Sequence, residues 1–249
     1  MNTVQVLPDR AAMGAAAGAV IADTLRQRLA ATDRLVRVVF AAAASQSEAL
    51  AALTQAPGID WSRIEGFHMD EYLGLPADHP SGFVNWLRHH LFSRVEFHAF
   101  HPILPGEAPH QTAAEYADLL AAAPIDLVVC GIGQNGHVAF NDPPVADFAD
   151  PLDAKVVELD ETCRRQQVTD GGFASFDDVP THAITLTVPR LMRASAIVCV
   201  VPGANKRAAV TAALTGPVTA ALPASILRTH PHVTFIFDQE AGADVDLSR

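Results

Sequence analysis

Short apolar segments rich in β-branched residues alternate with segments of helical periodicity along the chain, and this alternation constrains the fold more than any other feature. Such alternation is typical of βαβ units and a parallel sheet. We therefore predict an α/β fold, a single doubly wound, Rossmann-like domain over residues 1–249, with a mostly parallel sheet and helices on both faces. The predicted strands are residues 36–43, 64–68, 126–131, 155–159, 183–188, 196–201 and 233–237. The predicted helices are residues 10–31, 46–54, 82–92, 112–122 and 204–214.

The charge of the chain excludes two classes of partner. The formal net charge is −11. A chain this acidic repels nucleic acid and anionic membrane surfaces, so we expect neither as a partner. The sequence has no apolar run of the roughly 18 residues that a membrane span needs. The Ala-rich N-terminal segment predicts a helix rather than a signal peptide, because Asp9 precedes its apolar run and Asp23 interrupts the end of that run.

The cysteines indicate a reducing environment. Cys130, Cys163 and Cys199 form no CxxC pair, and two of them lie in apolar strand-like runs. This pattern favours neither a disulfide framework nor a zinc site. We expect a cytoplasmic protein that uses no metal and no cofactor.

Ligands of doubly wound sheets bind at the carboxyl ends of the strands, so the residues that follow each predicted strand are candidates for a site. Residues 44–48, Ala-Ser-Gln-Ser-Glu, follow one strand and open a helix. Small residues there let an anion reach the helix N-terminal amides, with the Ser45 hydroxyl as an extra donor. The alternative is that Ser45 is an ordinary helix N-cap. Lys206 lies at another helix start, after Gly203, and is either a phosphate ligand or a solvated surface lysine.

Two carboxylates follow the predicted strand 64–68. Burying Asp70 and Glu71 costs free energy unless they are solvated or functional. Partial burial would suit Asp70 to act as a general base. The alternative is an ordinary surface pair.

The richest segment is residues 131–143, GIGQNGHVAFNDP, which follows the predicted strand 126–131. Its glycines match the GxGxxG spacing of dinucleotide-binding proteins. We reject that reading because His137 interrupts the loop and residues 141–144, Asn-Asp-Pro-Pro, stop any helix early. His137 and Asp142 are better interpreted as a proton-transfer pair in which the carboxylate orients the imidazole. For His137 alone, the alternative is a structural histidine.

Taken together and in this order, these segments resemble the glucosamine-6-phosphate deaminase/isomerase family, whose fold is shared with 6-phosphogluconolactonases. The resemblance spans roughly residues 36–237. It rests mainly on residues 67–76, FHMDEYLGLP, and on residues 131–143. Residues 179–180, 183–186 and 203–206 support it.

The resemblance implies a metal-free conversion of an amino-sugar phosphate, glucosamine-6-phosphate, to fructose-6-phosphate and ammonia. Asp70 would be the base that moves a proton between C2 and C1, and His137 would open the sugar ring. Asp142 stands where the family usually has Glu and would tune His137. Asn135 completes the catalytic set. The resemblance matches Ser45 and Lys206 to phosphate-binding positions, and we expect Glu71, Gly136 and Arg164 to bind substrate as well.

Two segments depart from the family pattern. The usual phosphate loop, near Leu-Pro-Thr-Gly-Gly, is replaced by residues 41–47, AAAASQS. The phosphate-binding arginine of the family has no clear counterpart in residues 160–173, so Arg164 or Arg228 is expected to replace it. These changes leave open which sugar phosphate is the substrate. The sequence also leaves open whether the chain forms a homo-oligomer.

The sequence leaves three alternative functions on the same fold. A 6-phosphogluconolactonase typically continues Gly-His-Thr-Ala-Ser, whereas this chain continues Val138-Ala139-Phe140 after His137. A sugar-phosphate sensor is disfavoured because no basic N-terminal extension is present. An enzyme for a different amino-sugar phosphate is the third alternative.

Overall fold

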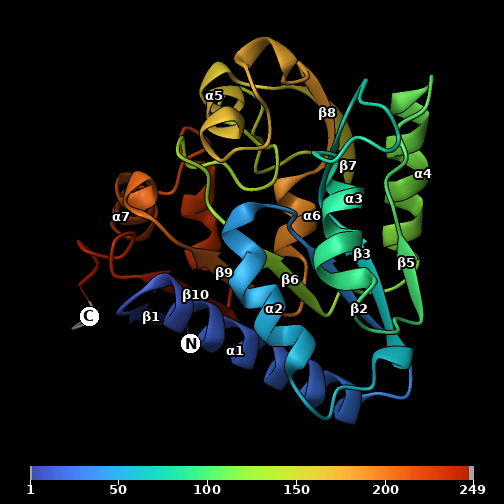
Figure 1. Ribbon diagram of the computed structural model, residues 1–249, viewed down its shortest axis with the longest axis vertical. Coiled ribbons are helices and arrows are strands. Elements are labelled where there is room, and N and C mark those ends of the chain that lie inside the picture. Colours follow the sequence, from blue (N-terminus) through green and yellow to red (C-terminus); the bar gives the residue numbers. More distant parts are fainter. Residues whose placement is uncertain (1, 247–249) are drawn as a thin grey trace.

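The computed structural model describes residues 2–246, and its main sheet has seven parallel strands in the order β1-β10-β9-β6-β2-β3-β5 (Figure 1). The predicted α/β fold with a mostly parallel sheet is therefore confirmed. The prediction of one domain over residues 1–249 includes residue 1 and residues 247–249, which lie outside the described residues. The strands of the main sheet are β1 Thr3–Leu7, β2 Val36–Phe40, β3 Ile64–His68, β5 Ala99–His101, β6 Leu127–Cys130, β9 Ile197–Val201 and β10 Val233–Asp238.

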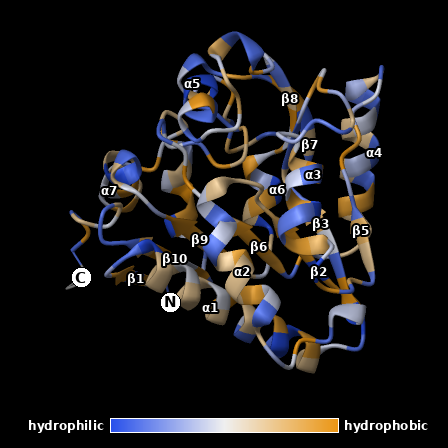
Figure 2. Cartoon of the chain, in the orientation of Figure 1, coloured by the Kyte–Doolittle hydropathy of each residue, from blue (hydrophilic) through white to orange (hydrophobic). Residues whose placement is uncertain are grey.

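Helices cover both faces of this sheet, and side chains alternate between the faces along each strand. On β2, Val38 and Phe40 pack in one cluster with residues of α1 and α2, whereas Val39 packs in the other with residues of α4, α6 and α7. Figure 1 shows α1 and α2 together over one face, and Figure 2 shows that the central strands are largely hydrophobic. The helices are α1 Arg10–Ala31, α2 Ser47–Gln55, α3 Phe83–Leu87, α4 Pro109–Ala121, α5 Glu161–Thr169, α6 Val188–Met192 and α7 Arg207–Thr215.

A second, antiparallel sheet of three strands lies beside the first, in the order β4-β8-β7. Its strands are β4 Asp70–Tyr72, β7 Ala154–Glu158 and β8 His182–Leu186. The strands predicted at 155–159 and 183–188 thus exist, but they pair with each other and with β4 rather than with the parallel sheet. Residues 70–72, for which no strand was predicted, form the edge strand β4.

Other predicted elements need smaller corrections. The helix expected at 82–92 is α3 followed by a π-helical turn, Arg88–Phe92. The predictions omitted β1, β5, α5 and α6. Helix α5 has only Cys163 and Gln166 buried, so its apolar periodicity is too weak to detect.

The order of the strands fixes the place of a site. From β2 the chain moves outward through β3 and β5, then returns to β6 on the other side of β2 and moves outward again through β9 and β10. The loops after β2 and β6 therefore diverge at their carboxyl ends and leave a crevice between them. No helix within residues 2–246 is long and apolar enough to cross a membrane.

Candidate active site

A pocket of about 370 Å³ lies at this switch point. Its size falls in the range usual for small-molecule sites. The loops after β2, β3, β6 and β9 and the loop after α5 form its wall. The lining includes residues 41–46, Met69, Asp70, Tyr72, residues 131–133, His137, Ala139, Phe140, Gln166, Gln167, residues 170–173 and Lys206.

Asp70 is the first residue of β4 and is only 6% exposed. It pairs with Thr185 of β8, and its side chain lines the pocket. Burial raises the pKa of the Asp70 carboxyl well above its usual range, and the charges of Glu71 and Asp142 raise it further. A carboxyl with a raised pKa at a pocket wall is a stronger base than an ordinary carboxylate and can both accept and return a proton.

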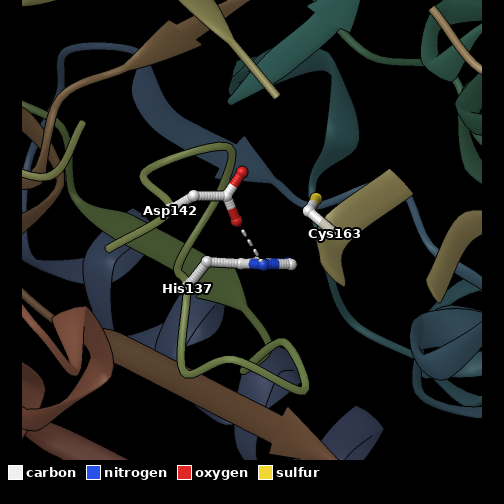
Figure 3. A group of neighbouring side chains, drawn as sticks. All are labelled: His137, Asp142 and Cys163. Atoms are coloured by element: carbon white, nitrogen blue, oxygen red, sulfur yellow. Dashed lines mark ion pairs between the residues drawn. The ribbon is translucent and has the colours of Figure 1, made fainter. Parts of the chain in front are cut away.

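His137 and Asp142 form an ion pair, with Nδ1 of the ring 2.9 Å from Oδ1 of the carboxylate (Figure 3). The ring N–H does not point straight at the oxygen, so Nδ1 makes no aligned hydrogen bond within residues 2–246. Burial by itself would raise the pKa of Asp142, but the contacts with His137 and Asn135 outweigh burial and lower it. Asp142 therefore reaches the ring directly, although its side chain is one methylene shorter than the Glu usual in the family.

Asn135 holds this pair in place. Its Nδ2 donates to Oδ1 of Asp142 at 2.9 Å, and its Oδ1 accepts from the backbone N–H of His137 at 3.1 Å. Oδ2 of Asp142 accepts from the backbone N–H of Asp160 at 3.1 Å. Asn135 does not line the pocket, so it acts on the other two residues rather than on a ligand.

Two glycines shape the loop that carries His137. A Cβ on Gly133 would lie 2.2 Å from Cε1 of His137, so only glycine allows the ring its position. Gly136 has a φ of +82° and packs against Leu222, outside the pocket lining. Ala139 has a φ of +52°, a conformation that costs roughly 1–3 kcal/mol and that clusters at functional sites.

Lys206 approaches the pocket from the turn after β9. Its side chain is 5% exposed, and its Nζ has no hydrogen-bond partner among the described residues. Burial lowers the pKa of Lys206 to about 8, against the opposing effect of Asp170. A buried ammonium without a partner implies an anionic ligand.

Ser45 and Gln46 complete this end of the pocket. Nε2 of Gln46 donates to the carbonyl of Val200 at 3.1 Å and to Oγ of Ser45 at 3.2 Å, which ties the loop after β2 to β9. The alternative for Ser45 is wrong, because the helix caps here are Ala43 and Gln46 and neither makes a side-chain cap bond.

Like Gly136, three further residues considered for substrate binding lie outside the pocket lining. The carboxylate of Glu71 accepts from the backbone N–H groups of Tyr72, Phe83 and Val84, so it anchors the start of α3. Arg164 donates to the carbonyls of Phe176 and Val179, and Arg228 donates to the carbonyls at the end of α7. None of the three lines the pocket, and each forms hydrogen bonds with backbone groups outside it.

A known protein family matches most of this chain. The model of the family described as glucosamine-6-phosphate isomerases/6-phosphogluconolactonase matches residues 8–236. The chain belongs to this family.

Individual relatives agree with this assignment. A glucosamine-6-phosphate deaminase of Exiguobacterium sp. (strain ATCC BAA-1283 / AT1b) is 40% identical over 190 residues, which are 74% of this chain and 71% of that protein. The deaminase of Listeria innocua serovar 6a (strain ATCC BAA-680 / CLIP 11262) is 36% identical over 215 residues, 85% of this chain and 89% of that protein. The solved structure of a monomeric glucosamine-6-phosphate deaminase superposes with a TM-score of 0.87 at 24% identity, over 97% of this chain and 99% of that chain. The resemblance seen in the sequence is thus confirmed.

Our sequence predictions did not include Tyr72 among the site residues. Its side chain is 2% exposed, lines the pocket and packs against Phe83, Phe140 and Phe173. Its hydroxyl has no partner in the described part of the chain. Burial raises the pKa of Tyr72 well above its usual range, so the hydroxyl stays protonated and can donate to a ligand.

Among the residues that the structure describes, one group of side chains beside this pocket could hold a metal ion. His137, Asp142 and Cys163 each offer a ligand atom, and these atoms lie within 4.8 Å of one another (Figure 3). The spacing of the three residues in the sequence did not suggest a site, because Cys163 comes from α5 and the other two from the loop after β6. Burial raises the pKa of the Cys163 thiol well above its usual range, and the charge of Asp142 adds to this effect.

Proposed function

We propose that this protein is a glucosamine-6-phosphate deaminase that converts its substrate and water to fructose-6-phosphate and ammonia. One arrangement carries the proposal: a buried carboxyl, Asp70, and a carboxylate-paired imidazole, His137, line the same pocket as the buried ammonium of Lys206. Relatives that are 36–40% identical over most of the chain bear the same name.

In this proposal Lys206, with Ser45 and the backbone at the start of α2, binds the phosphate. The ammonium supplies a charge-assisted hydrogen bond, and the helix start supplies N–H donors. The phosphate also stabilises the protonated form of Lys206, which burial disfavours. Because Glu71, Arg164 and Arg228 bind backbone groups elsewhere, we do not include them in phosphate recognition.

His137 then moves the proton that opens the sugar ring, with Asp142 and Asn135 holding the imidazole in place. Asp70 takes the proton from C2 and returns it to C1, which converts the aldose to a ketose imine that water hydrolyses to release ammonia. A cationic amino sugar in the pocket favours the ionised form of Asp70, so substrate binding prepares the base for this step.

The rival function is lactone hydrolysis, in which His137 would activate water and Asp70 would have no proton to move between carbons. A substrate panel separates the two. Ammonia release is measured from glucosamine-, galactosamine- and mannosamine-6-phosphate, beside hydrolysis of 6-phosphogluconolactone. We expect ammonia release from glucosamine-6-phosphate to be the fastest of these reactions. Lactone hydrolysis without ammonia release from any amino sugar would replace our proposal with the lactonase.

We further propose a cytoplasmic location, supported by three cysteines that are all free thiols. We expect no nucleic acid or membrane partner, because of the net charge of −11. Sedimentation of the purified protein would establish whether it is a monomer or a homo-oligomer.

A further inference from the structure

Cys163 has no role in the proposed reaction, yet it lies beside two residues that do. Its thiol, the His137 imidazole and the Asp142 carboxylate converge from α5 and from the loop after β6, and all three residues are buried (Figure 3). We propose that these three side chains form a binding site for a thiophilic divalent cation of the Zn²⁺ class. We further propose that its occupancy inhibits the enzyme reversibly.

The three ligand types suit such a cation. Imidazole nitrogen, carboxylate oxygen and thiolate sulfur are the ligands of zinc sites, at roughly 2.0–2.3 Å from the metal. Ligand atoms of a tetrahedral site at those bond lengths lie roughly 3.3–3.8 Å apart. The atoms here lie within 4.8 Å of one another, and Nδ1 of His137 is 2.9 Å from Oδ1 of Asp142. Shifts of about 1 Å in the ligand atoms would bring these separations into the tetrahedral range. The sulfur ligand selects Zn²⁺ over Mg²⁺ or Ca²⁺.

The surroundings already resemble the outer shell of a metal site. Asp142 accepts hydrogen bonds from Asn135 Nδ2 and from the backbone N–H of Asp160, which fixes the carboxylate. Nδ1 of His137 is buried beside Oδ1 of Asp142 without an aligned hydrogen bond within residues 2–246, so a cation bound by both atoms would replace a contact of poor geometry. On coordination the Cys163 thiol gives its proton to solvent and binds as the thiolate.

Three protein ligands leave a fourth position for water. His137 lines the pocket, and the proposed mechanism needs its imidazole for ring opening. As a metal ligand, this imidazole would no longer be free to move the proton. Binding of the cation does not depend on the proposed function; only its inhibitory effect does. The two claims can therefore fail separately.

The test uses the metal-free full chain and Co²⁺ as a spectroscopic probe, with Zn²⁺ as the competitor. We expect wild type to bind one Co²⁺ with a thiolate-to-metal charge-transfer absorption that one equivalent of Zn²⁺ abolishes. Cys163→Ser keeps the size of the side chain and should lose that band. Cys199→Ala alters a different buried cysteine, outside the pocket lining, and should keep it. In competition with a chelating dye, Cys163→Ser should weaken Zn²⁺ binding by more than the roughly 10–100-fold typical of an outer-shell change.

Circular dichroism of each variant checks that it is folded, and Asp142→Asn serves as a second ligand variant should Cys163→Ser not fold. A charge-transfer band that survives in the folded Cys163→Ser protein, or its absence in wild type, overturns the site. If Zn²⁺ binds as expected but leaves ammonia release from glucosamine-6-phosphate intact, the site stands and the inhibitory role is wrong. If wild type releases no ammonia at all, the proposed function fails and the binding result still decides the site.

Discussion

The imidazole of His137 occupies the space where a Cβ on Gly133 would lie, which would be 2.2 Å from Cε1 of the ring. Gly133→Ala should therefore displace the ring and lower turnover by about 100-fold, as a 1 Å misplacement of a catalytic group can. Gly106→Ala is the matched control, because a Cβ there meets nothing within 4 Å and should leave turnover unchanged. Equal turnover of both variants in steady-state assays would show that the close packing of Gly133 is not needed.

Substituting Asp70 should lower the activity of the enzyme and raise its stability. Asp70→Asn keeps the shape of the side chain but removes the base, so turnover should fall at least about 100-fold. The same variant should unfold at a higher temperature wherever the pH is high enough to ionise Asp70, because the wild type must then keep a charged carboxylate buried. A folded Asp70→Asn enzyme with near-normal turnover would contradict the role of Asp70 as base.

The gain in stability should depend on pH. The folded-state pKa of Asp70 is raised above the unfolded value, so the wild type loses stability as pH rises from the unfolded pKa towards the folded one. The difference in unfolding free energy between Asp70→Asn and wild type should thus be near zero at low pH and grow as pH rises. Urea unfolding across that range measures it, and a difference that shrinks with rising pH would reverse the assigned shift.

Lys206 should make substrate binding sensitive to alkaline pH. Its pKa of about 8 means that the ammonium loses its proton just above neutrality, so the KM for the sugar phosphate should rise as pH passes through this value. Lys206→Arg keeps the charge to far higher pH and should lack this rise. Lys206→Gln should raise KM by roughly 10–100-fold at pH 7, the worth of a charge-assisted hydrogen bond. If all three proteins share one alkaline profile, another group causes it.

The role of His137 is tested by a substrate that needs no ring opening. His137→Gln should slow the reaction of glucosamine-6-phosphate far more than that of an open-chain, ring-blocked analogue, because only the cyclic sugar needs the imidazole. The rate ratio of the two substrates, compared between variant and wild type, is the measurement. An equal slowing of both would move His137 to the isomerisation step.

Much of the site was predictable because its residues follow strands. Asp70, His137 and Lys206 each come shortly after a buried apolar run, and parallel strands bring their carboxyl ends to one edge. The structure brings all three into one pocket, as that rule predicts. The strand order itself, and hence the crevice between β2 and β6, depends on pairings that a single sequence does not reveal.

Glu71 lies outside the pocket, although we expected it to bind substrate, and the cause is physical. Residues 70–72 are too short to show periodicity, so β4 was not predicted. In a strand alternate side chains share a face, which places Asp70 and Tyr72 on one side and Glu71 on the other. Tyr72 accordingly lines the pocket, while Glu71 binds the start of α3. Cys163 was missed for a different reason, since its proximity to His137 arises only from tertiary structure.

Asp70 is held by the small antiparallel sheet, whereas His137 and Lys206 follow strands of the large parallel one. Only Met69 separates β3 from β4, so the chain passes from one sheet to the other in a single step. The proposed base and the proposed phosphate-binding lysine thus belong to different sheets. A substitution in the small sheet can therefore shift Asp70 while the loops that carry His137 and Lys206 keep their places on the large sheet.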